Sequence, residues 1–127
     1  MIDIYYAHHQ WKYGTKVERY EYDLIKRYFP NAKVFDPSTM INPEGLSEEA
    51  IMDICLRSVK DSDVVIFSSM DGCIGKGVYT EILKAESLGK LILYIYQDQL
   101  HTDWSIILNT NCTTDRVYAF IKMKGEK

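Results

Sequence analysis

The segment from residue 68 to 81 (SSMDGCIGKGVYTE) contains the residue types whose spacing could do chemistry. Gly72, Gly75 and Gly77 lie close together and allow the backbone to approach a ligand closely. Glu81 follows one helical turn after Gly77, so its carboxylate could point back over this segment. A helix N-terminus favours the ionised carboxylate, which suits a nucleophile or a group that stabilises an oxocarbenium-like centre. The spacing therefore makes Glu81 a candidate for such a role. A turn followed by a surface glutamate remains the simpler alternative.

Two common catalytic motifs are absent from this segment. Residues 75–77 (GKG) lack the Ser or Thr that would follow the lysine of a phosphate-binding P-loop. Ser68, Ser69 and Cys73 could suggest acyl transfer, but the sequence contains no GxSxG elbow. The segment therefore fits neither a phosphate-binding P-loop nor the nucleophile elbow of an acyl-transfer enzyme.

The elements that must position Glu81 alternate between strands and helices. Short apolar runs predict strands at residues 2–7, 33–35, 63–68, 91–96 and, more weakly, 116–123. Apolar residues at helical spacing predict helices at residues 16–29, after the N-cap residue Ser47, and at 77–88. This alternation predicts one α/β domain over residues 1–127, with a parallel sheet covered on both faces.

Ligands of such sheets bind beyond the carboxyl ends of the strands. Four predicted loops lie at this edge, namely residues 8–15, 36–47, 68–77 and 97–104. The third of them leads directly into the helix of Glu81. The predicted topology thus places the binding site at the same segment as the glycine pattern.

Charge and hydropathy narrow the class of partner. The net charge of −3 gives no general attraction to nucleic acid or membranes. No apolar run approaches the roughly 20 residues that span a bilayer. Lys12, Lys16 and Arg19 could steer a phosphate group, although such clusters are more often solvated helix ends. We expect a small-molecule ligand and neither a nucleic-acid polymer nor a membrane.

Cysteines and histidines indicate the compartment and the metal content. Cys55, Cys73 and Cys112 are odd in number and lack CxxC spacing, which favours a reducing compartment and therefore a cytoplasmic protein. His8 and His9 are adjacent and would point in opposite directions from a strand, so they could not bind one ion together. We expect no metal site.

Short motifs resemble the nucleoside 2-deoxyribosyltransferase-like group, which includes deoxynucleoside-monophosphate N-hydrolases. The matching residues are Ser62 to Ile66 (SDVVI), Asp71-Gly72, Gly77-x-x-x-Glu81, Ala85 and Gly89-Lys90. The resemblance covers about residues 2 to 95. It implies a flavodoxin-like three-layer sandwich with a parallel sheet of about five strands. It also implies that Glu81 is the nucleophile that attacks C1′ of the sugar.

The resemblance extends to other site residues. Tyr5 matches a tyrosine of the first strand and is expected to orient Glu81. The residues expected to hold base and sugar are His8, Asp36, Ser69, Asp71, Gly72, Gly75 and Gly77. The resemblance implies no metal or organic cofactor, and it implies a homo-oligomer. Cys55 departs from the pattern, because the group usually carries an aspartate there, and Gly75 stands where Asp or Ser is usual.

A second resemblance is to TIR domains. Residues 42–45 (NPEG), residues 62–68 (SDVVIFS) and Glu81 are similar to that family, in which a helix glutamate attacks NAD. Both interpretations break a bond between ribose C1′ and a nitrogenous base. The sequence therefore predicts cleavage or transfer at the N-glycosidic bond of a (deoxy)nucleoside or nucleotide. A TIR-like NAD hydrolase is one alternative, and an inactive nucleotide-binding or interaction module is another.

Overall fold

A five-stranded sheet forms the centre of the molecule in the computed structural model, which describes residues 1–70 and 74–104. The strands are β1 (Asp3–Ala7), β2 (Lys33–Phe35), β3 (Val64–Phe67), β4 (Leu91–Tyr96) and β5 (Gln99–His101). Their order is β2-β1-β3-β4-β5, the order of flavodoxin-like folds. The first four strands pair in parallel, and β5 pairs antiparallel to β4.

Side-chain caps begin the main helices. The helical elements are η1 (Gln10–Lys12), α1 (Lys16–Tyr28), α2 (Pro37–Met40), α3 (Glu48–Asp61) and α4 (Lys76–Ser87). Thr15 accepts a hydrogen bond from the amide of Glu18 at the start of α1, and Ser47 accepts one from Ala50 at the start of α3. The start of α4 has no side-chain cap, since Gly75 occupies that position.

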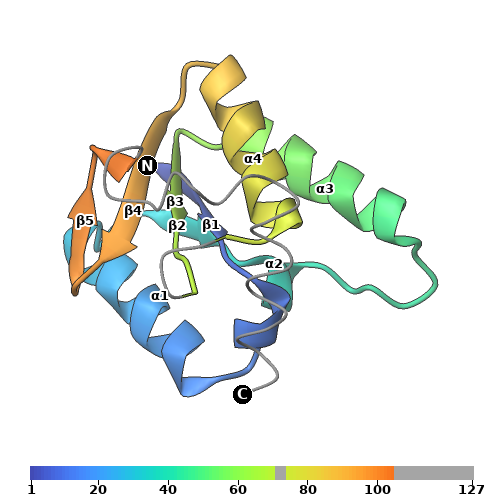
Figure 1. Ribbon diagram of the computed structural model, residues 1–127, viewed down its shortest axis with the longest axis horizontal. Helices are drawn as coiled ribbons and strands as arrows, with labels where there is room; N and C mark the ends of the chain where they lie inside the picture. Colours follow the sequence, from blue (N-terminus) through green and yellow to red (C-terminus); the bar gives the residue numbers. More distant parts are fainter. Residues whose placement is uncertain (71–73, 105–127) are drawn as a thin grey trace.

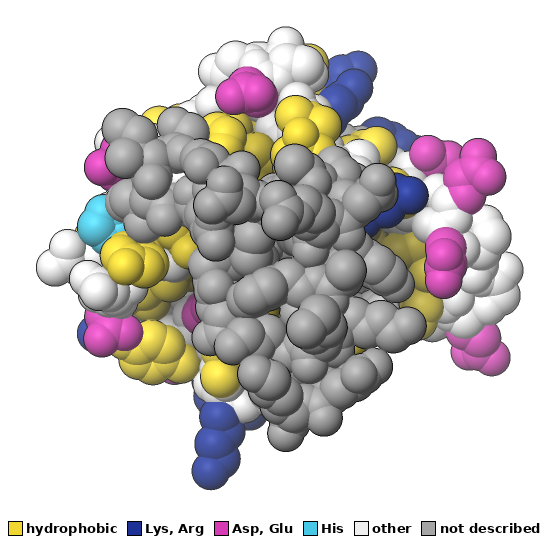
Figure 2. All heavy atoms as spheres, viewed as in Figure 1, with side chains coloured by type: hydrophobic (Ala, Val, Ile, Leu, Met, Phe, Trp, Pro, Cys, Tyr) yellow, Lys and Arg dark blue, Asp and Glu magenta, His cyan; other side chains and the backbone are white. Residues whose placement is uncertain are grey.

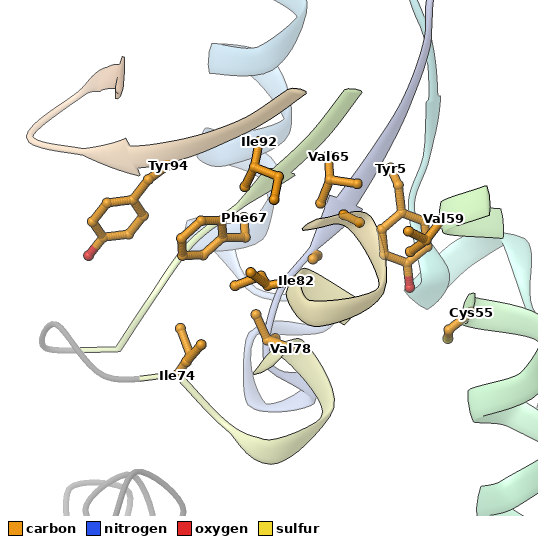
Figure 3. Packing of buried hydrophobic residues seen from close by; sticks show 12 residues of the cluster. Tyr5, Cys55, Val59, Val65, Phe67, Ile74, Val78, Ile82, Ile92 and Tyr94 are labelled. Carbon is orange, nitrogen blue, oxygen red and sulfur yellow. The ribbon is translucent and has the colours of Figure 1, made fainter. Parts of the chain in front are cut away.

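Helices cover both faces of the sheet (Figure 1). Along β3, Val65 and Phe67 pack with α3 and α4, whereas Val64 and Ile66 pack on the opposite face with Ile25 of α1. This alternation follows from the two-residue period of a strand. Figure 3 shows the larger cluster, in which Val65 and Phe67 lie above Ile82 and Val78 of α4. The predicted three-layer α/β architecture is confirmed.

The structure differs from the sequence-based expectation at its short elements. Strand β5 lies where we expected a loop, because Gln97 and Asp98 both adopt positive φ, of 50° and 64°, and form a tight hairpin. This turn was missed because it lacks the usual glycine. Both η1 and α2 are too short to show a helical period. The strand expected at residues 116–123 lies outside the described residues.

Several acidic side chains gather over the start of α3. Figure 2 shows them at the right of the molecule, over the start of α3, where Glu48 and Glu49 occupy the first turn. Carboxylates at this position interact favourably with the helix dipole.

No helix among the described residues is long and apolar enough to cross a membrane.

Candidate functional site

The structure brings Glu81 and Tyr5 together. Glu81 lies on the second turn of α4, which begins at Lys76, and only 5% of the residue is exposed. The hydroxyl of Tyr5, on β1, donates a hydrogen bond to the Glu81 carboxylate. Parallel pairing of β1 with β3 positions α4, which follows β3, beside the end of β1. The contact we expected between these two residues is therefore present.

Burial controls the protonation of Glu81. Desolvation raises its pKa to about 7, against hydrogen bonds from Tyr5 and Cys55 that favour the carboxylate. Desolvation thus opposes the ionisation that we expected the helix N-terminus to favour. A pKa near 7 is typical of carboxyl groups that act in catalysis. Burial and the charge of Glu81 also raise the pKa of Tyr5, so Tyr5 remains a hydrogen-bond donor.

Cys55 of α3 lies close to both Tyr5 and Glu81. In Figure 3 the Tyr5 hydroxyl extends past Val59 toward α3, where Cys55 lies. Burial raises the pKa of the Cys55 thiol to about 11, so the thiol is neutral near pH 7. The position where the resembling family carries an aspartate thus lies beside Glu81, and it holds a neutral group in this chain.

A cavity of about 320 Å³ opens against Glu81. Three segments line it: the residues after β1 (His8, His9, Gln10, Tyr13), α3 (Glu48, Ile51, Met52, Cys55) and the start of α4 (Lys76, Gly77, Val78, Glu81). It therefore lies between the chain segments that follow β1 and β3, the point where the strand order reverses. Its size and mixed lining suit a small-molecule ligand.

Glu48 is a pocket residue that sequence reasoning missed. Within the described part of the chain, Glu48 and Glu81 are the acidic residues that line this cavity. Glu48 is exposed in the first turn of α3. Its sequence context indicated only a helix start, since nothing in the spacing links it to a residue 33 positions later. Tertiary packing of α3 on α4 brings the two carboxyl groups to one pocket.

The predicted binding residues divide into several groups. His8 and Gly77 line the Glu81 cavity. Gly75 precedes α4 and lies against His9, so close that a Cβ atom there would be 2.7 Å from the His9 ring. Ser69 does not line the cavity, and its hydroxyl instead hydrogen-bonds to that of Tyr94. Asp71 and Gly72 lie outside the described residues.

Asp36 belongs to a second cluster with His8 and Glu18. Nε2 of His8 lies 2.6 Å from a Glu18 carboxylate oxygen and 3.7 Å from one of Asp36. All three residues are buried, and their ligating atoms lie within 4.8 Å of one another. Glu18 and Asp36 line a separate cavity of about 400 Å³. Sequence spacing hid this cluster because its members come from three different elements.

Lys12 lies in a buried network and is not a free phosphate-steering group. Its Nζ donates to Glu21 at 3.0 Å and to the Ser68 hydroxyl at 2.8 Å. The Tyr6 hydroxyl donates to the same Glu21 carboxylate at 2.6 Å. The hypothesis that Lys12 could steer a phosphate is therefore wrong, since the charge of Lys12 is neutralised inside the fold.

Comparison with known proteins does not assign this chain to a family. No protein-family model matches the chain, and no curated protein has a significantly similar sequence. Function is therefore inferred from the geometry of the Glu81 cavity and from the motif residues that it contains.

Proposed function

We propose that this chain cleaves the N-glycosidic bond of a (deoxy)nucleoside or nucleotide, or transfers the sugar to another base, with Glu81 as the nucleophile. One observation supports this proposal best. A buried carboxyl group with a pKa raised to about 7 lies in the wall of a cavity of about 320 Å³, held there by Tyr5. Such a group is partly ionised near neutral pH and weakly solvated, as a carboxylate nucleophile should be.

The reaction would proceed in two displacements. A carboxylate oxygen of Glu81 forms a bond to C1′ while the C1′–N bond breaks. The electron pair of the broken C1′–N bond leaves with the base, which takes up a proton. Water or a second base then attacks C1′, and the Glu81 carboxylate is released. Tyr5 would hold the carboxylate in one orientation through both steps.

Other cavity residues have roles in this scheme. Glu48 is the carboxyl group that could accept the proton of an attacking water. Ile51, Met52 and Val78 offer apolar surface to the base or the sugar. None of these steps requires a metal ion or an organic cofactor. The family resemblance further favours a homo-oligomer, which analytical ultracentrifugation would test.

Base release tests the proposal directly. Deoxynucleosides, their 5′-monophosphates, ribonucleosides and NAD are each incubated with the protein, and free base is measured by chromatography. We expect release from at least one nucleoside or nucleotide, with loss of at least about 10²-fold in Glu81→Gln, because the amide is not a nucleophile. Glu86→Gln, an exposed position on the same helix, is the matched control.

The outcomes separate the hypotheses. Release of nicotinamide from NAD alone would favour the TIR-like alternative with the same glutamate. Activity that survives in Glu81→Gln would rule out Glu81 as the nucleophile. No release from any substrate by the folded protein would contradict an enzymatic function.

One observation favours a second candidate, an inactive ligand-binding module. The neutral thiol of Cys55 lies beside Glu81 at the position where the resembling family carries an aspartate. A module of this kind would show ligand-dependent melting without product. In that case Cys55→Asp, which restores the missing carboxyl group, is expected to produce base release, whereas Cys55→Asn is not.

A further inference from the structure

A second group of potential ligating atoms surrounds His8, a residue that also lines the Glu81 cavity. His8 follows β1, Glu18 lies on α1, and Asp36 follows β2. Each residue is buried and contributes one nitrogen or oxygen atom, and these atoms lie within 4.8 Å of one another. Among the described residues, Glu18 and Asp36 do not line the Glu81 cavity, whereas His8 does.

The imidazole of His8 is oriented as a metal ligand would be. Its Nδ1 lies 3.1 Å from the backbone carbonyl oxygen of Tyr6. A carbonyl oxygen only accepts hydrogen bonds, so Nδ1 carries a proton and Nε2 faces Glu18 and Asp36. Histidines that bind metals commonly use this arrangement, in which a backbone carbonyl fixes the ring and leaves the other nitrogen for the ion.

The two carboxylates are fixed in a similar way. Glu18 accepts a hydrogen bond of 2.9 Å from the amide of Gly14. Asp36 accepts two bonds from Ser38 through the same oxygen, Oδ1, at 2.9 Å from the amide and 2.8 Å from the hydroxyl. Backbone carbonyl, amide and hydroxyl groups thus orient all three side chains. Because Oδ1 is also the Asp36 oxygen nearest to Nε2, an ion bound there would take the place of one Ser38 hydrogen bond.

The charge of the cluster is not balanced by basic side chains. Two carboxylates face one imidazole. In the described part of the chain, no lysine or arginine forms an ion pair with either carboxylate, and Lys12 is paired with Glu21. Arg19 lines the adjoining cavity without such a pair. A divalent cation held by the three side chains would balance the charges of both carboxylates.

The spacing also fits an ion after a small adjustment. Ligands that are each about 2.1 Å from a metal lie about 3.0–3.4 Å apart in octahedral or tetrahedral geometry. The 3.7 Å between Nε2 and Asp36 is close to this value, the 2.6 Å to Glu18 is shorter, and all three atoms lie within 4.8 Å of one another, so an ion would require small shifts of the side chains. We propose that His8, Glu18 and Asp36 bind one divalent transition-metal ion.

The donor set indicates which ions suit the site. One imidazole nitrogen with two carboxylates matches Zn²⁺ and Mn²⁺ better than the all-oxygen sites of Ca²⁺ or Mg²⁺. Three protein ligands leave at least one coordination position open. Because Glu18 and Asp36 line the cavity of about 400 Å³, water or an oxygen-donor ligand in that cavity could reach an ion held by these carboxylates.

Direct metal binding tests this proposal without reference to activity. The purified protein, stripped with chelator, is dialysed against Zn²⁺ alone or Mn²⁺ alone, and bound metal is quantified by atomic emission. We expect one equivalent of at least one ion per chain. Glu18→Gln and Asp36→Asn should each weaken its binding by at least about 100-fold, and circular dichroism would confirm that both variants remain folded.

His101→Gln is the control for adventitious binding, since His101 lies 3.9 Å from Asp103 near the surface on β5. We expect this variant to bind the same equivalent as the unmodified chain. The proposal would be overturned if neither ion binds, or if binding survives in both Glu18→Gln and Asp36→Asn. Loss of the bound ion in His101→Gln alone would also overturn it. None of these outcomes depends on Glu81.

Discussion

At the scale of single residues, burial of Glu81 links stability to function. The carboxyl group is enclosed by β1, α3 and α4, and desolvation raises its pKa from 4.5 to about 7. The folded chain therefore binds this proton more tightly than the unfolded chain does. With respect to Glu81, the fold is most stable below pH 4.5, and it loses that stability as the pH rises toward 7 and above.

We expect Glu81→Gln to stabilise the protein at alkaline pH. A pKa difference of this size corresponds to about 3 kcal/mol, at 1.36 kcal/mol per pKa unit. The amide carries no charge and can still accept the Tyr5 hydrogen bond. Urea unfolding should show the variant more stable by about this amount at pH 8 and nearly equal at pH 4.5. A difference independent of pH would contradict the pKa assignment, and Glu86→Gln serves as control.

The same pKa predicts the pH profile of activity. Only the ionised carboxylate of Glu81 is a nucleophile, so kcat/KM for base release should rise with pH up to about 7 and then level. Initial rates at low substrate concentration between pH 5 and 9 would measure this. A profile that stays flat through pH 7 would show that a different group limits the reaction.

At the scale of elements, the start of α4 depends on two glycines with different surroundings. A Cβ atom on Gly75 would lie 2.7 Å from Cδ2 of His9, whereas one on Gly77 would meet only Met52 at 3.5 Å. The His9 ring cannot move freely, because its Nδ1 accepts a hydrogen bond of 3.0 Å from the amide of Trp11. The packing of His9 thus leaves no room for a methyl group at Gly75, whereas Gly77 has room for one.

Alanine substitutions should therefore have opposite effects. Gly75→Ala should destabilise the fold by about 1–3 kcal/mol through overpacking. Gly77→Ala should stabilise it by about 0.5–1 kcal/mol, since alanine is the better helix former. Thermal unfolding of the two variants beside the unmodified chain would measure both. Equal changes of the same sign would mean that His9 does not pack against this junction.

The buried pair of Lys12 and Glu21 joins η1 to α1 and, through Ser68, to the end of β3. Lys12→Met leaves the Glu21 carboxylate buried without its cation, which should cost about 3–5 kcal/mol. The double variant Lys12→Met with Glu21→Gln should be less destabilised than Lys12→Met alone. Denaturant unfolding measures both, and Lys16→Met, at an exposed site, should change stability by less than about 0.5 kcal/mol. If the double variant is the less stable, the charge of Glu21 is not the cause.

At the scale of the whole molecule, stability depends on the sheet being covered on both faces. Ile66 is fully buried in β3 on the α1 face, whereas Leu91 at the start of β4 is 49% exposed. Ile66→Ala should cost about 2–5 kcal/mol in chemical denaturation, and Leu91→Ala about 1 kcal/mol or less. Similar losses for the two variants would argue against the layered arrangement in Figure 1.

The sequence by itself determined the elements that rest on local patterns. Apolar runs predicted β1, β3 and β4, with the bounds of β4 correct, and Ser47 predicted the start of α3. The glycine-rich segment before α4 made Glu81 a candidate, and its catalytic role stays a prediction. The expected contact with Tyr5 came from the family resemblance and is present. The predicted strands β1, β3 and β4 and the start of α3 are confirmed, because strand burial and helix capping depend on residues near one another in the chain.

Tertiary structure alone decided the properties that depend on distant residues. The burial of Glu81, and hence its raised pKa, comes from packing between elements that the sequence separates. Glu48 joins the same cavity, and Lys12 is neutralised by Glu21, only through such packing. Desolvation and ion pairing act through space over a few ångströms, so no local spacing in the sequence can reveal them.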